Sequence, residues 1–232
     1  MSIAEKLTTI AENVPKVYEA GAKSEYDRFW DAYQSNSSGF GYGVKPYYYA
    51  FAGSGWNDDT FKPKYNIKMR YSNISAFSYF EGTDLINLLK VAGVTLDTSE
   101  ATSLSGLFAY STVARIPTLD FRKASSLSNV FYECKSLLYV EKMLVGEKNT
   151  FSTNTFYGCN ELIEIRFEGV IASDISLSHC GKLSYDSVDN IIDTLSDLTG
   201  GTAKTITWHS TVLDNLTVEQ YTKITNKNWK LA

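Results

Sequence analysis

The sequence predicts an α+β solenoid of stacked parallel strands, with an aromatic-rich N-terminal cap, an α/β C-terminal cap and an N-terminal helix. Three stretches are versions of one phrase: LSGLFAYSTVARI (104–116), LSNVFYECKSLLYV (127–140) and FSTNTFYGCNELIEI (151–165). They align on Phe108, Phe131 and Phe156, which are 23 and 25 residues apart. Self-similarity at this period is typical of an array whose units each contribute one strand and one return segment. Because no unit can bury its apolar side alone, neighbouring units share one core.

Four segments are predicted from the extent of these copies. They are an N-terminal helical segment (1–34), the aromatic-rich cap (35–82), the repeats (83–183) and the C-terminal cap (184–232). Two weaker copies, ISAFSYFEGTDL (74–85) and ISLSHCGKLS (175–184), extend the pattern at both ends.

The first 34 residues carry a short heptad pattern. Apolar residues recur at intervals of 4, 3, 4 and 3, at Ile3, Leu7, Ile10, Val14 and Val17. This is the spacing of a coiled-coil seam, but Pro15 would break or restart the helix. The segment is either a helix packed on the solenoid or a docking helix that makes the chain a homo-oligomer. Its sequence also resembles the start of proteins that phages and prophages of gut Firmicutes encode, often near tail genes.

Residues 39–80 are unusually rich in aromatic side chains, with glycines between them. We expect an irregular cap whose rings cover the first repeat. The alternative is a stacking platform for sugar rings or a partner protein, since aromatic residues dominate contact energy at recognition surfaces. Its candidate binding residues are Tyr47, Tyr49 and Trp56. A helix is predicted next, with Thr83 as N-cap and Gly93 at its end.

Each repeat contains a short run in which apolar residues alternate with polar ones. Period-two alternation places the apolar side chains on one face of a strand. The expected inward residues are Leu119 and Phe121, then Val140 and Leu144, then Ile163, Ile165 and Phe167. The expected outward residues are Thr118, Asp120 and Arg122, then Glu141 and Met143, then Glu164, Arg166 and Glu168. The outward set forms either a solvated sheet face or a contact strip for a protein or a glycan.

The repeats resemble a known family in three stretches. FYECKSLLYV (131–140), FYGCNELIEI (156–165) and the spacing of LDTSEATSLSGLF (96–108) are similar to BspA-type leucine-rich repeats over residues 74–183. The resemblance implies a leucine-rich-repeat solenoid of parallel strands. Two features depart from the pattern, because Ser111 and Thr112 stand where the cysteine is expected and GEKNT (146–150) inserts extra residues.

Cys134 and Cys159 recur at one position of the repeat and are expected to be small buried side chains in a ladder. Three cysteines do not make a disulfide framework. His179 and His209 are the only histidines, so neither a metal site nor a cofactor is predicted.

The C-terminal cap has clear boundary signals. Ser184 is a suitable helix N-cap, and Thr217 with Gln220 forms a capping box for the last helix. The apolar positions of this cap are Val188, Ile191, Ile192 and Leu195 on the first helix, Ile206 and Trp208 on a strand, Val218, Tyr221 and Ile224 on the last helix, and Trp229 and Leu231 at the end.

No catalytic constellation is found in the sequence. The run GGTAKT (200–205) is a poor match to a phosphate-binding loop, and GSG (53–55) lacks the spacing of a nucleophile elbow. Asp58 and Asp59 are interpreted as solvated loop charges. No catalytic residue is assigned and no enzyme is expected. An enzyme that acts on glycans is the remaining alternative, and a deep cleft with two facing carboxylates would favour it.

The net charge of −4 gives no electrostatic reason to expect a nucleic acid or an anionic membrane as partner. No stretch approaches 18 apolar residues, so no membrane insertion is expected. The N-terminus carries acids and lacks the apolar run of a secretory signal. We therefore expect a protein that is cytoplasmic at synthesis, with the virion as an alternative destination.

Three function hypotheses follow. The first is a noncatalytic recognition protein of a phage or prophage, associated with the tail, that binds a protein or glycan on a host surface. The second is an intracellular phage-encoded inhibitor that binds a host cytosolic protein. The third is a bacterial surface adhesin like other BspA-type proteins, which the lack of an export or anchoring segment disfavours.

Overall fold

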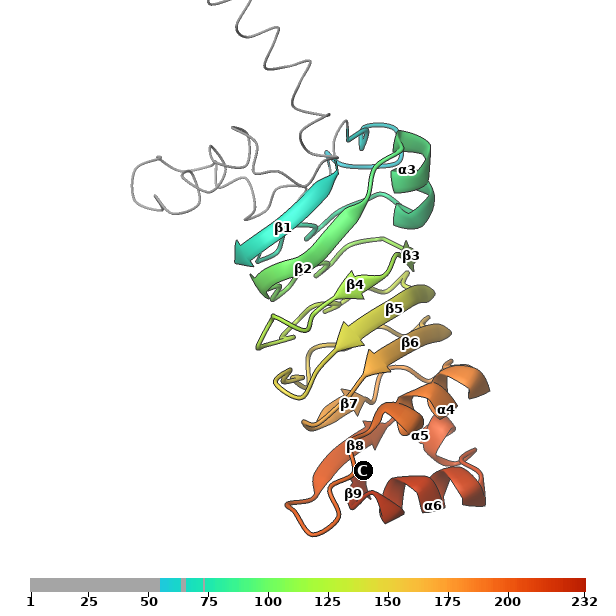
Figure 1. Ribbon diagram of the computed structural model, residues 1–232. Coiled ribbons are helices and arrows are strands. Elements are labelled where there is room, and N and C mark those ends of the chain that lie inside the picture. The colour runs from blue at the N-terminus through green and yellow to red at the C-terminus, as the bar shows by residue number, and fades with distance from the viewer. Residues whose placement is uncertain (1–54, 64–65, 73) are drawn as a thin grey trace, which may run out of the picture. The chain divides into compact units, whose positions relative to one another are not determined.

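The computed structural model describes residues 55–63, 66–72 and 74–232 (Figure 1). All of them belong to one compact unit of the chain, 48–232. The predicted N-terminal helical segment (1–34) lies outside the described residues, and so do Tyr47 and Tyr49.

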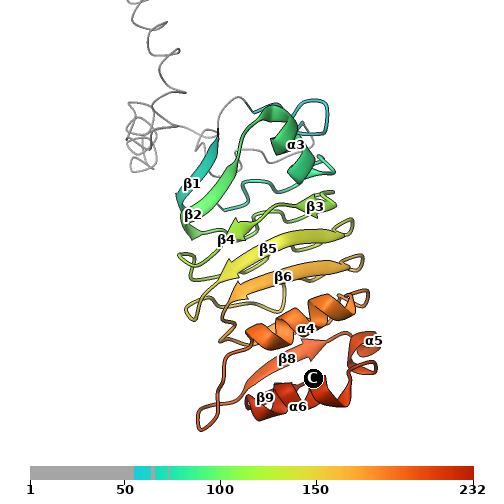
Figure 2. The same ribbon diagram turned by 45° about the vertical axis from the view of Figure 1, so that its right-hand side comes forward.

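The described residues form an α+β fold on parallel sheets, as the sequence predicts. One sheet pairs β1 with β2, a second joins β3, β4 and β6 to β5, and a third has the order β7-β8-β9. Figures 1 and 2 show these strands following one another in chain order. The strands are β1 (Ile67–Ser72), β2 (Leu96–Ser103), β3 (Arg115–Ile116), β4 (Leu119–Asp120), β5 (Tyr139–Val145), β6 (Glu164–Gly169), β7 (Ile175–Leu177), β8 (Lys204–Trp208) and β9 (Trp229–Leu231). The helices are α3 (Leu85–Ala92), α4 (Tyr185–Thr194), α5 (Ser210–Leu213) and α6 (Val218–Asn226).

The phenylalanines on which the copies align lie in one buried row. The ring of Phe131 stacks between Phe108, at 6.0 Å, and Phe156, at 5.5 Å. Phe77, from the weaker copy at 74–85, continues the row 5.2 Å from Phe108. The backbone N–H groups of Phe77, Phe108 and Phe131 each donate to a carbonyl oxygen of the following copy. Equivalent positions of successive copies therefore lie side by side.

The cysteines are buried, as expected, and bind the backbone. The Sγ–H of Cys134 donates to the carbonyl oxygen of Phe108 over 3.0 Å, and that of Cys159 donates to Phe131 over 3.1 Å. Burial raises the pKa of the Cys134 and Cys180 thiols to about 12. A thiol with so high a pKa is a poor nucleophile and metal ligand, because both roles need the thiolate.

The predicted alternation is wrong in β5. The pairing of β5 with β6 shifts register between Val140 and Met143, as it does at a β-bulge. Two residues instead of one therefore separate these buried side chains. Met143, expected to face outward, is fully buried, and Leu144, expected to face inward, is only half-buried beside buried Val145.

The alternation is confirmed in β4 and β6. Leu119, Phe121, Ile165 and Phe167 are all buried. Ile163 was expected inward but is 41% exposed, because it precedes the first residue of β6 and lies in the turn that leads into the strand.

The helix after β1 begins one residue later than predicted. Asp84, rather than Thr83, is the N-cap of α3, and its carboxylate accepts from the N–H of Asn87. Thr83 is engaged elsewhere, since its N–H and its hydroxyl both donate to Asp58 at 2.7 Å. Gly93 ends the helix in the left-handed conformation, as predicted.

The predicted C-terminal cap elements are present, with one error of orientation. Ser184 caps α4, and Thr217 with Gln220 forms the capping box of α6. Val218 and Tyr221 were expected on the apolar face of α6 but are 85% and 53% exposed. Ile224, the third residue predicted on this face, is buried, and Gln220 rather than Val218 or Tyr221 is buried with it. The other predicted apolar residues of the cap are buried or packed against the core: Val188, Ile191, Ile192, Leu195, Ile206, Trp208, Trp229 and Leu231.

Candidate functional site

The outer face of β4, β5 and β6 carries the predicted charged side chains. Five of them are exposed and Asp120 is half-buried; the exposed ones are Arg122, Glu141, Glu164, Arg166 and Glu168. Met143 is absent from this face because of the register shift in β5.

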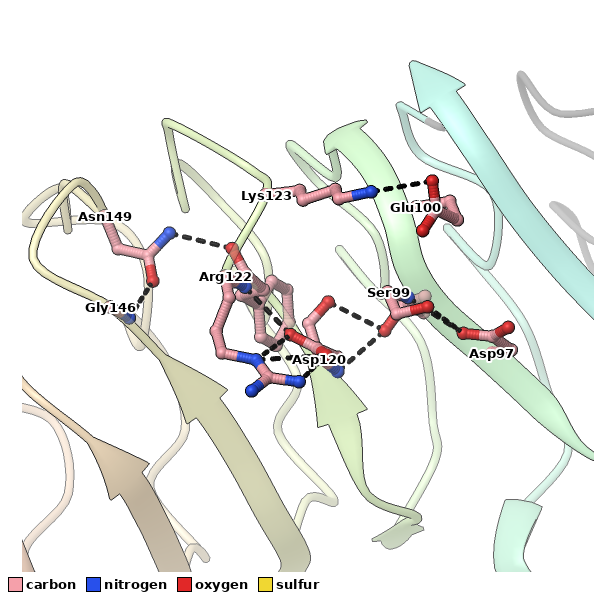
Figure 3. Close-up of polar contacts among 10 residues, drawn as sticks. Asp97, Ser99, Glu100, Asp120, Arg122, Lys123, Gly146 and Asn149 are labelled. Carbon is pink, nitrogen blue, oxygen red and sulfur yellow. Dashed lines mark hydrogen bonds and ion pairs between the residues drawn. The ribbon is translucent and has the colours of Figure 1, made fainter.

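Asp120 and Arg122 form a close ion pair on this face. The guanidinium Nη2 of Arg122 lies 2.6 Å from Asp120 Oδ2, and its Nε and backbone N–H also donate to this carboxylate (Figure 3). Partial burial would raise the pKa of Asp120, but the hydrogen bonds from Arg122 outweigh it and hold the pKa below its usual value. The carboxylate of Asp120 therefore already accepts hydrogen bonds from Arg122, two residues further along the chain.

Other charges on this side of the molecule also have partners within the chain. Glu141 accepts from both the N–H and the hydroxyl of Thr118 at 2.9 Å. Glu168 pairs with Lys142 at 2.6 Å. Because these acceptors are occupied, the predicted strip has few charges that a ligand could use without breaking an internal contact.

Glu164 and Arg166 are the exceptions. Among the residues that the structure describes, neither side chain forms an ion pair or a side-chain hydrogen bond. They are exposed residues of β6, and they are the part of the predicted strip that is open to a partner.

A loop outside the predicted site contributes further polar contacts to the region drawn in Figure 3. Asn149, in the GEKNT insertion, is 1% exposed. Its amide Nδ2 donates to the carbonyl oxygens of Phe121 and Ala124, and its Oδ1 accepts from the N–H of Gly146. The buried side chain of Asn149 thus links the insertion to the preceding copy. The N–H and the hydroxyl of Thr150 add hydrogen bonds to the carbonyl oxygen of Ser125.

Trp56, the described residue of the predicted aromatic platform, packs toward the interior. It is half-buried, and its ring meets Phe61 edge-on with centroids 6.2 Å apart. Phe61 in turn contacts Phe77 and Phe80. These contacts favour the cap interpretation for this residue.

A different surface, which the sequence did not reveal, carries a continuous row of rings. We call it the tyrosine row, and its members are Tyr79, Tyr110, Tyr132, Tyr157 and His179. Each ring touches the next, with centroid distances of 4.9, 5.3, 5.3 and 4.1 Å in that order. Tyr79 is 55% exposed, Tyr110 46% and Tyr157 37%. One ring comes from each of five successive copies, so the row crosses the repeats.

Two members of the row have a strained backbone. Tyr79 and Tyr110 have φ of 57° and 61°, in the left-handed region. This conformation costs an L-residue about 1–2 kcal/mol. The same repeat position is glycine in a later copy, Gly158, which has φ of 80°. Glu133, at this position in the copy that carries Tyr132, also has a φ of 58°. The left-handed conformation is therefore a feature of the turn in each of these copies and is not specific to the tyrosines.

The tyrosine row escaped sequence analysis for a positional reason. Tyr79 and Tyr110 follow the aligned phenylalanine by two residues, whereas Tyr132 and Tyr157 follow it by one. Only the turn geometry brings both positions into one line. The signal available in the sequence was that each of the four copies with an aligned phenylalanine has a tyrosine within two residues of it.

Neither a candidate metal site nor a membrane-spanning helix is present among the residues that the structure describes. The described residues contain no group of three or more His, Cys, Asp and Glu placed to hold a metal ion. In the same part of the chain, no helix combines the length and the apolar character needed to cross a membrane.

Comparisons with protein-family models, with curated proteins and with solved structures found no match for this chain.

Proposed function

We propose that this chain is a noncatalytic recognition protein of a phage or prophage, associated with the tail, that binds a host surface. In this proposal the copies form a solenoid of the BspA-type leucine-rich-repeat class. The parallel strands, the buried phenylalanine row and the hydrogen bonds between equivalent positions of successive copies support that class.

The tyrosine row is the observation on which the binding function rests. Solvent-exposed tyrosines in contact with one another offer a rigid amphipathic surface at little entropic cost, and tyrosine is enriched among residues that dominate binding energy.

The charged outer face of the sheet supports binding less well. Its carboxylates at Asp120, Glu141 and Glu168 already accept hydrogen bonds from within the chain. Exposed ion pairs of this kind contribute little to affinity. We assign this face a secondary role, with Glu164 and Arg166 as its available contacts.

Binding of the labelled full chain to intact cells of a panel of gut Firmicutes tests the proposal. We expect saturable binding to at least one strain that excess unlabelled chain displaces. If no strain binds it, and the chain instead captures a single cytosolic protein from cell lysate in a one-to-one complex, the host-surface function is wrong and the intracellular inhibitor replaces it.

A further inference from the structure

We propose that the tyrosine row binds a neutral linear glycan, with successive sugar rings lying along successive aromatic rings. This inference deepens the proposed recognition function and rests on it for the biological setting.

The direction of the row indicates a polymeric ligand. The five rings come from five successive copies of the repeat and are in unbroken contact. A small molecule would cover one or two of them. A chain that runs along the repeats can contact all five.

The spacing of the rings favours a sugar polymer over a peptide. Neighbouring tyrosine centroids are 4.9–5.3 Å apart, a distance similar to the length of one pyranose unit in a linear glycan. An extended peptide presents side chains to one face about every 6.7 Å, and a polyproline helix repeats about every 9.3 Å. The side-chain spacing of neither peptide matches the spacing of the rings in the tyrosine row.

The chemistry of the row also matches a sugar. Tyrosine combines an apolar ring with a hydroxyl that donates and accepts, and a pyranose combines C–H faces with hydroxyls. Tyr79 and Tyr110 stack nearly parallel, 8° apart, so each ring covers one face of the other, and the two residues remain 55% and 46% exposed.

Charge favours a neutral glycan. The carboxylate of Glu133, next to Tyr132, pairs with Lys135 at 3.0 Å. Beyond His179, Lys182 pairs with Glu161 at 2.6 Å. Because these flanking charges compensate each other, the row has no charge pattern that would select a polyanion or a polycation.

Calorimetry with the full chain and neutral linear oligosaccharides of two to six sugars tests the inference. The probes are β-1,4-linked glucose, xylose, mannose and N-acetylglucosamine oligomers and β-1,3-linked glucose oligomers. We expect at least one series to bind, with affinity rising at least tenfold from the disaccharide to the hexasaccharide. The inference is wrong if no hexasaccharide binds at millimolar concentration.

Substitutions separate loss of the ring from loss of the fold. Tyr110→Asn removes the ring and introduces a residue that tolerates the left-handed backbone better, so it should fold and bind the hexasaccharide at least fivefold more weakly. Tyr157→Ala should weaken binding similarly, whereas Tyr110→Phe keeps the ring and should weaken it less. Tyr221→Ala, which removes an exposed tyrosine of α6, is the matched control and should bind like the unsubstituted chain. Equal binding by Tyr110→Asn, Tyr157→Ala and the control would overturn the inference.

Failure of this inference can be told from failure of the proposed function. If the chain binds cells, protease treatment of the cells abolishes this binding and no hexasaccharide competes with it, the ligand is a protein and the glycan assignment is wrong while the recognition function stands. If oligosaccharides bind but no cell does, the glycan site stands without the host-surface function. If Tyr110→Asn instead dissociates an oligomer in analytical ultracentrifugation, the row is a self-association surface and the inference fails.

Discussion

Cys134 Sγ lies 3.0 Å from the carbonyl oxygen of Phe108 and 3.6 Å from Ser111 Oγ, so the thiol of one copy contacts the preceding copy twice. Ser111 occupies the equivalent position one copy earlier. The buried position that Cys134 and Ser111 share therefore accepts either a thiol or a hydroxyl, provided that the side chain is small and can donate.

Burial of the thiols predicts that stability falls at high pH. The native pKa of Cys134 and Cys180 is about 12, against 9.0 in the unfolded chain. Above pH 9 the unfolded state loses these protons and the native state keeps them, so stability declines as the pH rises from 9 toward 12. The expected loss at pH 10 is about 1.4 kcal/mol for each thiol. Urea unfolding at pH 8, 9 and 10 measures it.

The control for this prediction is Cys134→Ser, which keeps a small donor but removes the titrating thiol. The free energy of unfolding of this variant should fall less between pH 8 and pH 10 than that of the unsubstituted chain. An identical pH dependence would mean that Cys134 does not titrate differently in the native and unfolded states.

Asn149 is expected to be essential for the stability of the insertion. Asn149→Ala leaves the carbonyl oxygen of Phe121 and the N–H of Gly146 without these bonds in a buried site, and should lower the free energy of unfolding by about 3 kcal/mol. Asn160→Ala, at an exposed asparagine of the next copy, should change it by less than about 0.5 kcal/mol. Similar urea midpoints for the two variants would contradict the role given to Asn149.

The sequence predicted those features that local patterns determine. The three aligned phenylalanines, the N-cap Ser184 and the capping box at Thr217 depend on residue type and spacing over short ranges, and all are present. Features that depend on pairing between copies were missed. Met143 faces inward because a register shift in β5 resets the alternation, and such a shift leaves no mark in the strand's own sequence.

The candidate site was less predictable than the fold for the same reason. The outward charges of β4 and β6 followed from alternation, but their pairing within the chain did not. The tyrosine row needed the turn geometry that aligns Tyr110 with Tyr132. On α6, the predicted apolar face of Val218, Tyr221 and Ile224 is buried only at Ile224, because tertiary contacts bury the face that Ile224 shares with Gln220.

The Asp120–Arg122 pair predicts a specific change in titration. Arg122→Met removes the guanidinium that lowers the pKa of Asp120, so this pKa should rise toward or above 3.8. The stabilisation from the ionised carboxylate is present above pH 3.8 and is lost as the pH falls through the lowered native pKa, so the variant should lose less stability in acid. Carboxyl-detected NMR measures the pKa. Arg166→Met, on β6, which β5 separates from β4, should leave the Asp120 titration unchanged. An equal shift in both variants would argue against a direct pair.

Lys227 is expected to stabilise the end of α4. Its Nζ donates to the carbonyl oxygens of Ile192, Asp193 and Leu195 at 2.8–2.9 Å, and the last carbonyls of a helix otherwise lack partners. Lys227→Met keeps the aliphatic stem and removes these bonds, so it should lower the free energy of unfolding by about 2 kcal/mol. Lys223→Met is the matched control, since this exposed lysine of α6 contacts Asp193 only through its carboxylate. Hydrogen exchange should show faster opening of α4 in the Lys227 variant alone; equal protection of α4 in both variants would show that Lys227 does not cap this helix.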